Sequence, residues 1–131
     1  MKQTTNSIIL RQDDYETLIV YLNDYRYATL RDAQNVQDLK AELKKALLVS
    51  KDSFPDDVVR LNSIIKIKDA GKNNVMEFIL VTPDKADLKQ KKISVMSPVG
   101  TALIGFRKGQ KVSWPVPAGK KTFYIVDVIN D

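Results

Sequence analysis

The fold is decided by residues 93–105, which read Ile93-Ser94-Val95-Met96-Ser97-Pro98-Val99-Gly100-Thr101-Ala102-Leu103-Ile104-Gly105. The first four residues have the β-branched and apolar character of a short strand. Ser97 then suits the N-cap of a helix, with Pro98 at the first helical position and Gly105 as a left-handed terminator. The stretch therefore predicts a strand that leads directly into a helix of about two turns.

Short β-branched runs surround this helix and are separated by turn residues. Further strands are predicted over residues 58–61, 64–67, 75–81, 112–116 and 122–129, with turns over 69–74 and 117–120. Trp114 alternates with Val112 and Val116 and is therefore predicted to lie in the core. Residues 54–131 are thus expected to form an antiparallel sheet with one short helix against it.

The first 53 residues have a different pattern, because all five glycines and all five prolines lie after them. Asp13 with Glu16 is typical of a helix start. Two apolar stripes with helical spacing follow: Tyr15, Leu18, Ile19 and Leu22, then Val36, Leu39, Leu43, Ala46 and Leu47. They predict a short antiparallel coiled-coil hairpin in residues 1–53, preceded by a strand over 8–10. Such a hairpin is marginally stable alone and is expected to pack against the second part of the chain.

The amino-acid composition excludes several classes of function. The chain has 131 residues and contains neither cysteine nor histidine, which excludes thiolate nucleophiles, Cys/His metal sites and imidazole-dependent triads. No apolar run approaches the ~20 residues that span a bilayer, and the first residues lack a secretory signal. We therefore expect an α+β protein in the cytoplasm with no membrane partner. Residues 54–131 hold 13 basic and 8 acidic side chains and so carry the whole net charge of +5.

Few residues qualify as catalytic or metal-binding candidates. The Ser97 hydroxyl, at a helix N-terminus, suits an anion or a nucleophile, but helix capping explains it without an imidazole partner. Two pairs of adjacent acids, Asp13-Asp14 and Asp56-Asp57, could supply ligands to Mg²⁺. Asp13 is better explained as a helix cap, and Asp56-Asp57 as the residues through which the chain enters a strand. Neither a metal nor a cofactor is therefore predicted.

A basic cluster lies between two predicted strands and consists of Lys85, Lys89, Lys91 and Lys92 with Asp84 and Asp87. Two interpretations of this cluster remain: it is a solvated loop, or it is a basic patch that binds nucleic acid or an acidic protein surface. No aromatic residue is interleaved with these lysines, as base stacking requires, and the other lysines of this half are scattered along the sequence. Direct sequence-specific contact with nucleic acid is therefore not expected.

With these features in place, the second part resembles a known family. The run over 93–105, followed by Gly109-Gln110, Val112 and Pro117-Ala118-Gly119, closely resembles the C-terminal domain of the GreA/GreB transcription elongation factors. Residues 58–63 match the segment that opens that domain, and the resemblance covers roughly residues 54–131. The short hairpin and the Phe54-Pro55 opening are most like the Rnk group, regulators of nucleoside diphosphate kinase. The resemblance implies an FKBP-like fold for this part.

The resemblance also implies a partner, bacterial RNA polymerase, bound at the rim of its secondary channel. The candidate partner-binding residues are Ser97, Pro98, Val99 and Gly100, of which Ser97 and Pro98 carry over from the family's docking loop. Met96 departs from the polar residue that cleavage factors have there. In Gre factors, acidic residues at the tip of a long coiled coil help to hold a catalytic Mg²⁺, so the reach of the hairpin decides whether this chain can do the same.

The hairpin here is expected to be too short for that task. Arms of about 14 to 18 residues give roughly 21 to 27 Å, about half of what delivery would require. The candidate contact residues at the tip mix acids with arginine and tyrosine: Asp24, Tyr25, Arg26, Tyr27 and Asp32. We therefore expect a regulator that binds polymerase and is not an enzyme.

Three alternatives stay open at this point. The chain could be a cleavage factor that uses Asp24 and Asp32. It could be a peptidyl-prolyl isomerase of the FKBP type, although no matching aromatic pocket is evident in the sequence. It could also be an interaction module for another protein, such as nucleoside diphosphate kinase. The oligomeric state and the direction of the effect on transcription are likewise open.

Overall fold

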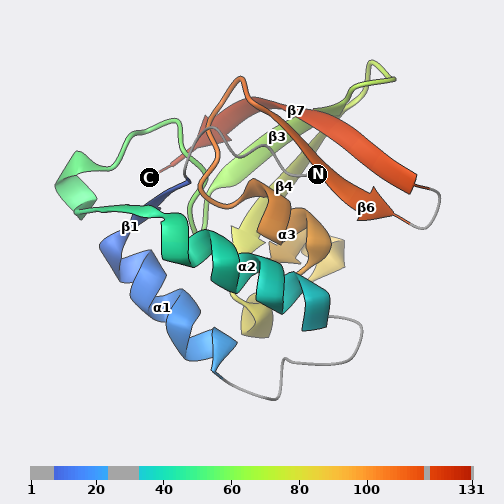
Figure 1. The fold of residues 1–131 in the computed structure, drawn as a ribbon. Coiled ribbons are helices and arrows are strands. Elements are labelled where there is room, and N and C mark those ends of the chain that lie inside the picture. The colour runs from blue at the N-terminus through green and yellow to red at the C-terminus, as the bar shows by residue number, and fades with distance from the viewer. Residues whose placement is uncertain (1–7, 24–32, 117–118, 131) are drawn as a thin grey trace.

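A computed structural model describes residues 8–23, 33–116 and 119–130 (Figure 1). Its elements are β1 (Ile9–Arg11), α1 (Gln12–Leu22), α2 (Ala33–Lys45), β2 (Leu47–Val49), η2 (Lys51–Ser53), β3 (Ile64–Asp69), β4 (Val75–Val81), η3 (Pro83–Lys85), η4 (Leu88–Gln90), β5 (Lys92–Ser94), α3 (Pro98–Leu103), β6 (Lys111–Val116) and β7 (Gly119–Ile129). The η elements are single 3₁₀ turns. None of the helices in the described ranges has the length and hydrophobicity that a bilayer crossing requires.

The main sheet has five strands in the order β5-β4-β3-β7-β6. Strand β3 pairs antiparallel with both β4 and β7, and β6 pairs antiparallel with β7. The predicted α+β class is confirmed. The predicted all-antiparallel sheet is wrong at one edge, because β5 runs parallel to β4. The chain between these strands passes through η3 and η4 instead of a tight hairpin, so β5 starts at the same end of the sheet as β4.

One strand prediction and one helix prediction also need correction. Residues 58–61 do not form a strand: Val58 makes only an isolated bridge to Arg107, and the chain turns where the Arg60 amide donates to Ser63 Oγ. Leu47 was assigned to a helical stripe, but α2 ends at Lys45 and Leu47 begins β2, with 57% of its surface exposed. Strand β2 pairs in parallel with β1, the strand expected before the hairpin.

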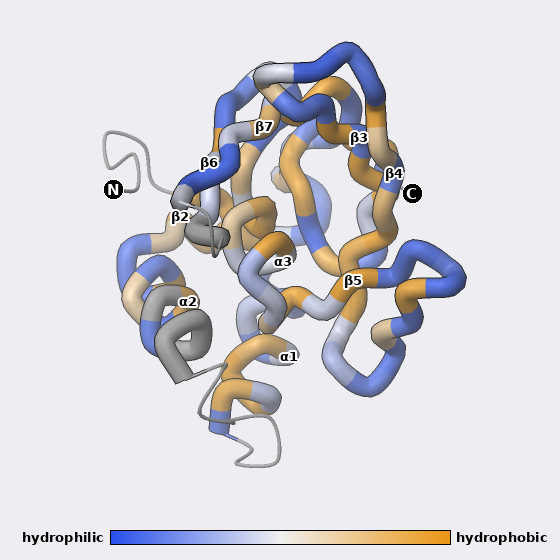
Figure 2. Tube along the Cα trace, turned by 90° about the vertical axis from the view of Figure 1, so that its right-hand side faces the viewer, coloured by the Kyte–Doolittle hydropathy of each residue, from blue (hydrophilic) through white to orange (hydrophobic). Residues whose placement is uncertain are grey.

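The described helices lie on one side of the main sheet, and α1 and α2 run in opposite directions beside each other (Figures 1 and 2). One continuous core joins the helices to the inner face of the sheet. It includes Leu18 and Leu22 of α1 and Leu39 and Leu43 of α2, together with sheet residues such as Ile65. The expectation that the hairpin packs against the second part of the chain is therefore confirmed.

Trp114 also lies in the core, as predicted, and is only 7% exposed. Its ring stacks on that of Phe123, with 4.5 Å between the ring centroids. The predicted cap at Asp13 is wrong. Helix α1 already begins at Gln12, two residues before the start that a cap at Asp13 implies, and its N-cap residue, Arg11, makes no side-chain cap. Arg11 instead donates two hydrogen bonds of 2.7 Å to the Asp13 carboxylate.

Candidate docking site

The loop between β5 and α3 is fixed by its own side chains. Ser97 is the N-cap of α3, as predicted, and its Oγ accepts a hydrogen bond of 3.1 Å from the Gly100 amide. The same hydroxyl donates to the Ser94 carbonyl oxygen at 2.7 Å. Both hydrogen bonds lie within the loop. The Ser97 side chain therefore shapes the backbone and leaves the nucleophile alternative without support in the geometry.

Helix α3 packs directly on the strand that precedes it. A Cβ atom added at Gly100 would lie 2.1 Å from the Ser94 carbonyl oxygen, so no side chain fits there. The neighbouring Thr101 hydroxyl donates a hydrogen bond of 3.0 Å to the Val95 carbonyl oxygen inside the core. Residues 94–101, which we call the α3 platform, are held together by these side-chain hydrogen bonds and by the close packing of Gly100 on the Ser94 main chain.

The four predicted partner-binding residues differ in what they present to a partner. Pro98 is exposed, Ser97 and Val99 are half-buried, and Gly100 is buried. Val99 packs against the core. A partner that meets the platform can therefore contact the Pro98 ring directly, whereas Gly100 contributes only by allowing the close packing of the helix. The five candidate residues at the hairpin tip, Asp24, Tyr25, Arg26, Tyr27 and Asp32, lie outside the described residues.

The lysine-rich segment next to the platform is an exposed loop with a defined shape. The backbones of Asp87 and Lys92 exchange two hydrogen bonds of 2.9 Å, which close the loop at its base. Leu88, at the start of η4, is 81% exposed and is surrounded in sequence by lysines. Sequence reasoning missed this leucine, because an isolated apolar residue in a charged run carries no periodic signal. The loop leads through β5 into the platform.

The paired acids do not assemble into a cation site. Among the residues that the structure describes, no three acidic side chains come together in a way that could hold a metal. Asp57 Oδ1 lies 3.4 Å from Arg107 Nε. Asp13 pairs with Arg11 and Asp14 with Arg60, so each of these three acids faces a guanidinium group.

Comparison with known proteins identifies the family to which this arrangement belongs. Residues 54–130 match the family described as "Transcription elongation factor, GreA/GreB, C-term". The chain belongs to the GreA/GreB family. It is 36% identical over 116 residues to the "Regulator of nucleoside diphosphate kinase" of Escherichia coli strain K12, and this alignment covers 88% of the chain and 83% of that protein. The resemblance inferred from residues 93–105 is thereby confirmed.

Two other relatives show how much of a Gre factor the chain represents. Transcription elongation factor GreA of Pelobacter propionicus is 36% identical over 93 residues, which cover 71% of this chain but only 59% of that GreA. A solved GreA/GreB elongation factor from Nitrosomonas europaea superposes with a TM-score of 0.78 at 31% identity, covering 94% of this chain and 99% of that chain.

In this GreA/GreB family member, helix α1 is joined to residues 54–131 by polar contacts as well as by the core. Arg60 Nε and an Arg60 terminal nitrogen each donate a hydrogen bond of 2.9 Å to the Asp14 carboxylate, whose side chain is 5% exposed. Burial raises the pKa of Asp14 despite this partner. Periodicity did not reveal the pair, because a buried acid on a helix is visible only through its partner.

A second polar contact joins α1 to the loop that begins with η3. Tyr21 Oη donates a hydrogen bond of 2.6 Å to Asp84 Oδ1. Hydrogen bonds from the Thr82 and Tyr21 hydroxyls lower the pKa of the Asp84 carboxyl. The ends of α1 are thus both held, by Asp14 near its start and by Tyr21 near its end.

Proposed function

We propose that this protein binds bacterial RNA polymerase through the α3 platform, near the secondary channel, and modulates transcription without stimulating transcript cleavage. The observation that carries the proposal is the loop over residues 94–101, which exposes Pro98 and is held in shape by its own hydrogen bonds. A preformed loop loses little conformational entropy when it binds. Membership of the GreA/GreB family supports polymerase as the partner.

The reach of the helical arms supports the absence of cleavage activity. Only 34 residues run from Gln12 to Lys45, so a helical hairpin made from them extends at most about 26 Å. Part of this length is packed against residues 54–131, because Leu18, Leu22 and Leu39 belong to the common core. A carboxylate must come within about 2.1 Å of Mg²⁺ to coordinate it. Arms of this length are suited to occupying a docking site and not to delivering a ligand deep into a channel.

Charge supports the same partner. The half of the chain that contains the α3 platform carries the whole net charge of +5. A basic domain that approaches an acidic protein surface gains association rate from electrostatic steering, and salt screens that gain. We also propose the division that goes with this function, with a helical unit over 1–53 and a docking unit over 54–131.

Binding to purified core RNA polymerase tests the docking proposal. The variant Pro98→Asp places a charge on the α3 platform and is expected to weaken binding at least about ten-fold. Val75→Asp is the matched control, because Val75 is also an exposed apolar residue and the β3–β4 turn lies away from α3 (Figure 1). The proposal fails if no complex forms at micromolar concentrations, or if Pro98→Asp binds as tightly as the control.

Arrested elongation complexes test the second half of the proposal. With Mg²⁺ present, we expect the RNA to keep its length when the protein is added. A Gre factor that stimulates cleavage serves as the positive control in the same reaction. Shortened RNA in the presence of this chain would support the cleavage alternative instead.

A second candidate function follows from the relative that is named a regulator of nucleoside diphosphate kinase. The 36% identity over 88% of this chain makes a shared protein partner worth testing. The test is direct binding to purified nucleoside diphosphate kinase, with Pro98→Asp again as the probe of the α3 platform.

A further inference from the structure

The outer face of the main sheet gathers residues that are scattered along the sequence. Strand β7 alternates, so that Phe123 and Ile125 are buried in the core while Tyr124 lies on the opposite face. Tyr124 is 44% exposed. The described helices all lie on the other side of the sheet (Figures 1 and 2). An aromatic ring is therefore exposed on a face of the sheet that none of the described helices covers.

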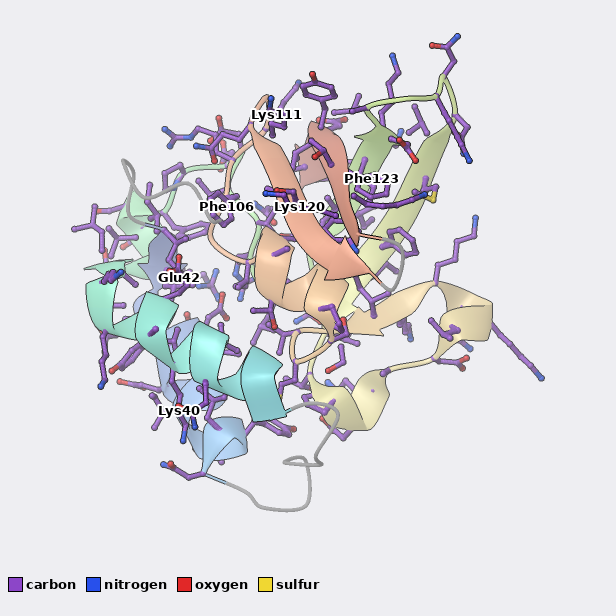
Figure 3. The ribbon with its side chains drawn as sticks, turned by 45° about the vertical axis from the view of Figure 1, so that its right-hand side comes forward. Lys40, Glu42, Phe106, Lys111, Lys120 and Phe123 are labelled. Atoms are coloured by element: carbon purple, nitrogen blue, oxygen red, sulfur yellow. The ribbon has the colours of Figure 1, made fainter. Side chains whose placement is uncertain are left out.

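Two lysines flank this ring on the neighbouring strands. Lys68 of β3 and Lys111 of β6 are both in register with Tyr124. With strands about 4.8 Å apart, the two lysines rise from backbones roughly 10 Å apart, one on each side of the ring. Figure 3 shows Lys111 at the start of β6, directed away from the helices. The three residues form a row with the order cation, aromatic ring, cation.

The row is free of acidic side chains. Within the described part of the chain, neither Lys68 nor Lys111 has an ion-pair partner. The acids of this face belong to the next row, where Glu77 and Asp127 are in register with Lys66. Asp127 also pairs with Lys108 at 3.5 Å. The two charges that flank the Tyr124 ring are therefore both positive and complement an anionic ligand.

Two hydroxyl groups adjoin the row. Ser113 of β6 and Thr122 of β7 are in register with each other, and both are half-buried on the outer face. Thr122 precedes Tyr124 by two residues on the same strand, a separation of about 6.8 Å. A hydroxyl pair at that distance from a stacking ring can exchange hydrogen bonds with a ribose 2′-hydroxyl.

We propose that this outer face, formed by β3, β7 and β6, binds single-stranded RNA without sequence preference. One base stacks on Tyr124, phosphates lie next to Lys68 and Lys111, and Ser113 and Thr122 face the ribose. An exposed aromatic ring between cations on an open sheet is the arrangement that single-stranded nucleic acid uses. A duplex does not fit it, because its bases are stacked on each other. An acidic peptide would use the lysines and leave the ring without a role.

Fluorescence anisotropy with the full chain tests the proposal in the absence of polymerase, so that its failure and the failure of polymerase docking are separate results. The probe is a labelled oligouridylate RNA of about 12 nucleotides, within the range of single-strand site sizes. Tyr124→Thr keeps the preference for a strand but removes the ring, and is expected to weaken binding about five-fold or more. Tyr124→Phe keeps the ring and is expected to bind like the unmodified protein.

The lysines are tested through the salt dependence of binding. The double variant Lys68→Gln with Lys111→Gln is expected to weaken binding and to reduce the slope of log K against log salt by about 1.4, because two phosphate contacts are lost. The control is Lys44→Gln with Lys45→Gln, which removes the same charge from exposed positions at the end of α2. Trp114 fluorescence during urea unfolding verifies that every variant is folded.

Four results would overturn the proposal. Tyr124→Thr could bind as tightly as Tyr124→Phe, or the control pair of lysines could matter as much as Lys68 and Lys111. Duplex RNA or a polyglutamate peptide could compete as well as the single strand. Equal binding of the matching single-stranded DNA would overturn the assignment to RNA, since the hydroxyl pair would then have no ribose contact.

Discussion

Arg60 donates two hydrogen bonds of 2.9 Å to the carboxylate of Asp14 and thereby joins the first helix to the segment that precedes the main sheet. Both side chains are largely removed from water, with 15% and 5% of their surfaces exposed. A buried ion pair adds little net stability over an apolar pair, but losing one partner leaves the other charge buried and unpaired. The pair therefore specifies where α1 lies.

Arg60→Ala is expected to lower the free energy of unfolding by about 3 to 5 kcal/mol at pH 7. Burial raises the pKa of Asp14 in the folded state, so Asp14 favours folding below its unfolded pKa of 3.8 and ceases to do so as the pH rises through the folded value. The loss in Arg60→Ala should therefore be smaller at pH 4 than at pH 7. Urea unfolding at both pH values measures it. A loss that does not depend on pH would contradict this explanation.

Gly100→Ala is expected to destabilise the protein by about 3 kcal/mol, because the new Cβ would overlap the main chain of Ser94. Gly71→Ala is the matched control. A Cβ at Gly71 would lie 3.7 Å from Asp69 Oδ1, an ordinary contact, so little change is expected. Thermal unfolding of both variants measures the difference. Similar midpoints for the two variants would show that α3 does not pack as closely as the structure indicates.

Ser97→Ala is expected to lower the free energy of unfolding by about 1 to 2 kcal/mol. The substitution removes the helix cap and leaves the Gly100 amide without its acceptor. Ser53→Ala, at an exposed position in η2, should change stability by less than about 0.5 kcal/mol. Urea unfolding followed by Trp114 fluorescence compares them. A loss in Ser97→Ala no greater than in Ser53→Ala would remove the structural role assigned to the hydroxyl.

The substitution Asp13→Asn is expected to lower the free energy of unfolding at pH values above about 4, and to have no effect at pH 2. The hydrogen bonds from Arg11 lower the pKa of Asp13 to about 2, so its stabilising effect is present above the unfolded pKa of 3.8 and is lost as the pH falls toward 2. The Asp13 side chain is 58% exposed, and the effect should stay below about 1 kcal/mol. Unfolding curves of both proteins should converge between pH 4 and pH 2. A constant difference down to pH 2 would contradict the assignment.

Much of the fold could be predicted because its signals are local. Ser97, Pro98 and Gly105 mark the two ends of α3, and Gly105 has the predicted left-handed backbone, with φ at 83°. The turn over 69–74 and the buried stripe of α1 were predicted for the same reason. A cap, a left-handed glycine or an amphipathic stripe depends on residues within a few positions of one another.

The candidate site was predicted less completely. The four platform residues were identified as one group of contacts, but only Pro98 is exposed, while Gly100 is buried and Ser97 uses its hydroxyl within the loop. Leu88 was not identified as an exposed apolar residue. Exposure depends on which parts of the chain cover a residue, and those parts are distant in sequence.

By itself, the sequence determined the strand-to-helix motif at residues 93–105, the concentration of positive charge after residue 53 and membership of the family. Only the tertiary structure shows that Tyr124 lies between Lys68 and Lys111 and that Asp14 is hydrogen-bonded to Arg60. For the Tyr124 row the physical reason is strand register, which long-range hydrogen bonds and a bulge between β3 and β7 fix. For Asp14 and Arg60 it is the packing of α1 against residues distant in sequence. Because side chains alternate along a strand, a shift by one residue would turn Tyr124 into the core.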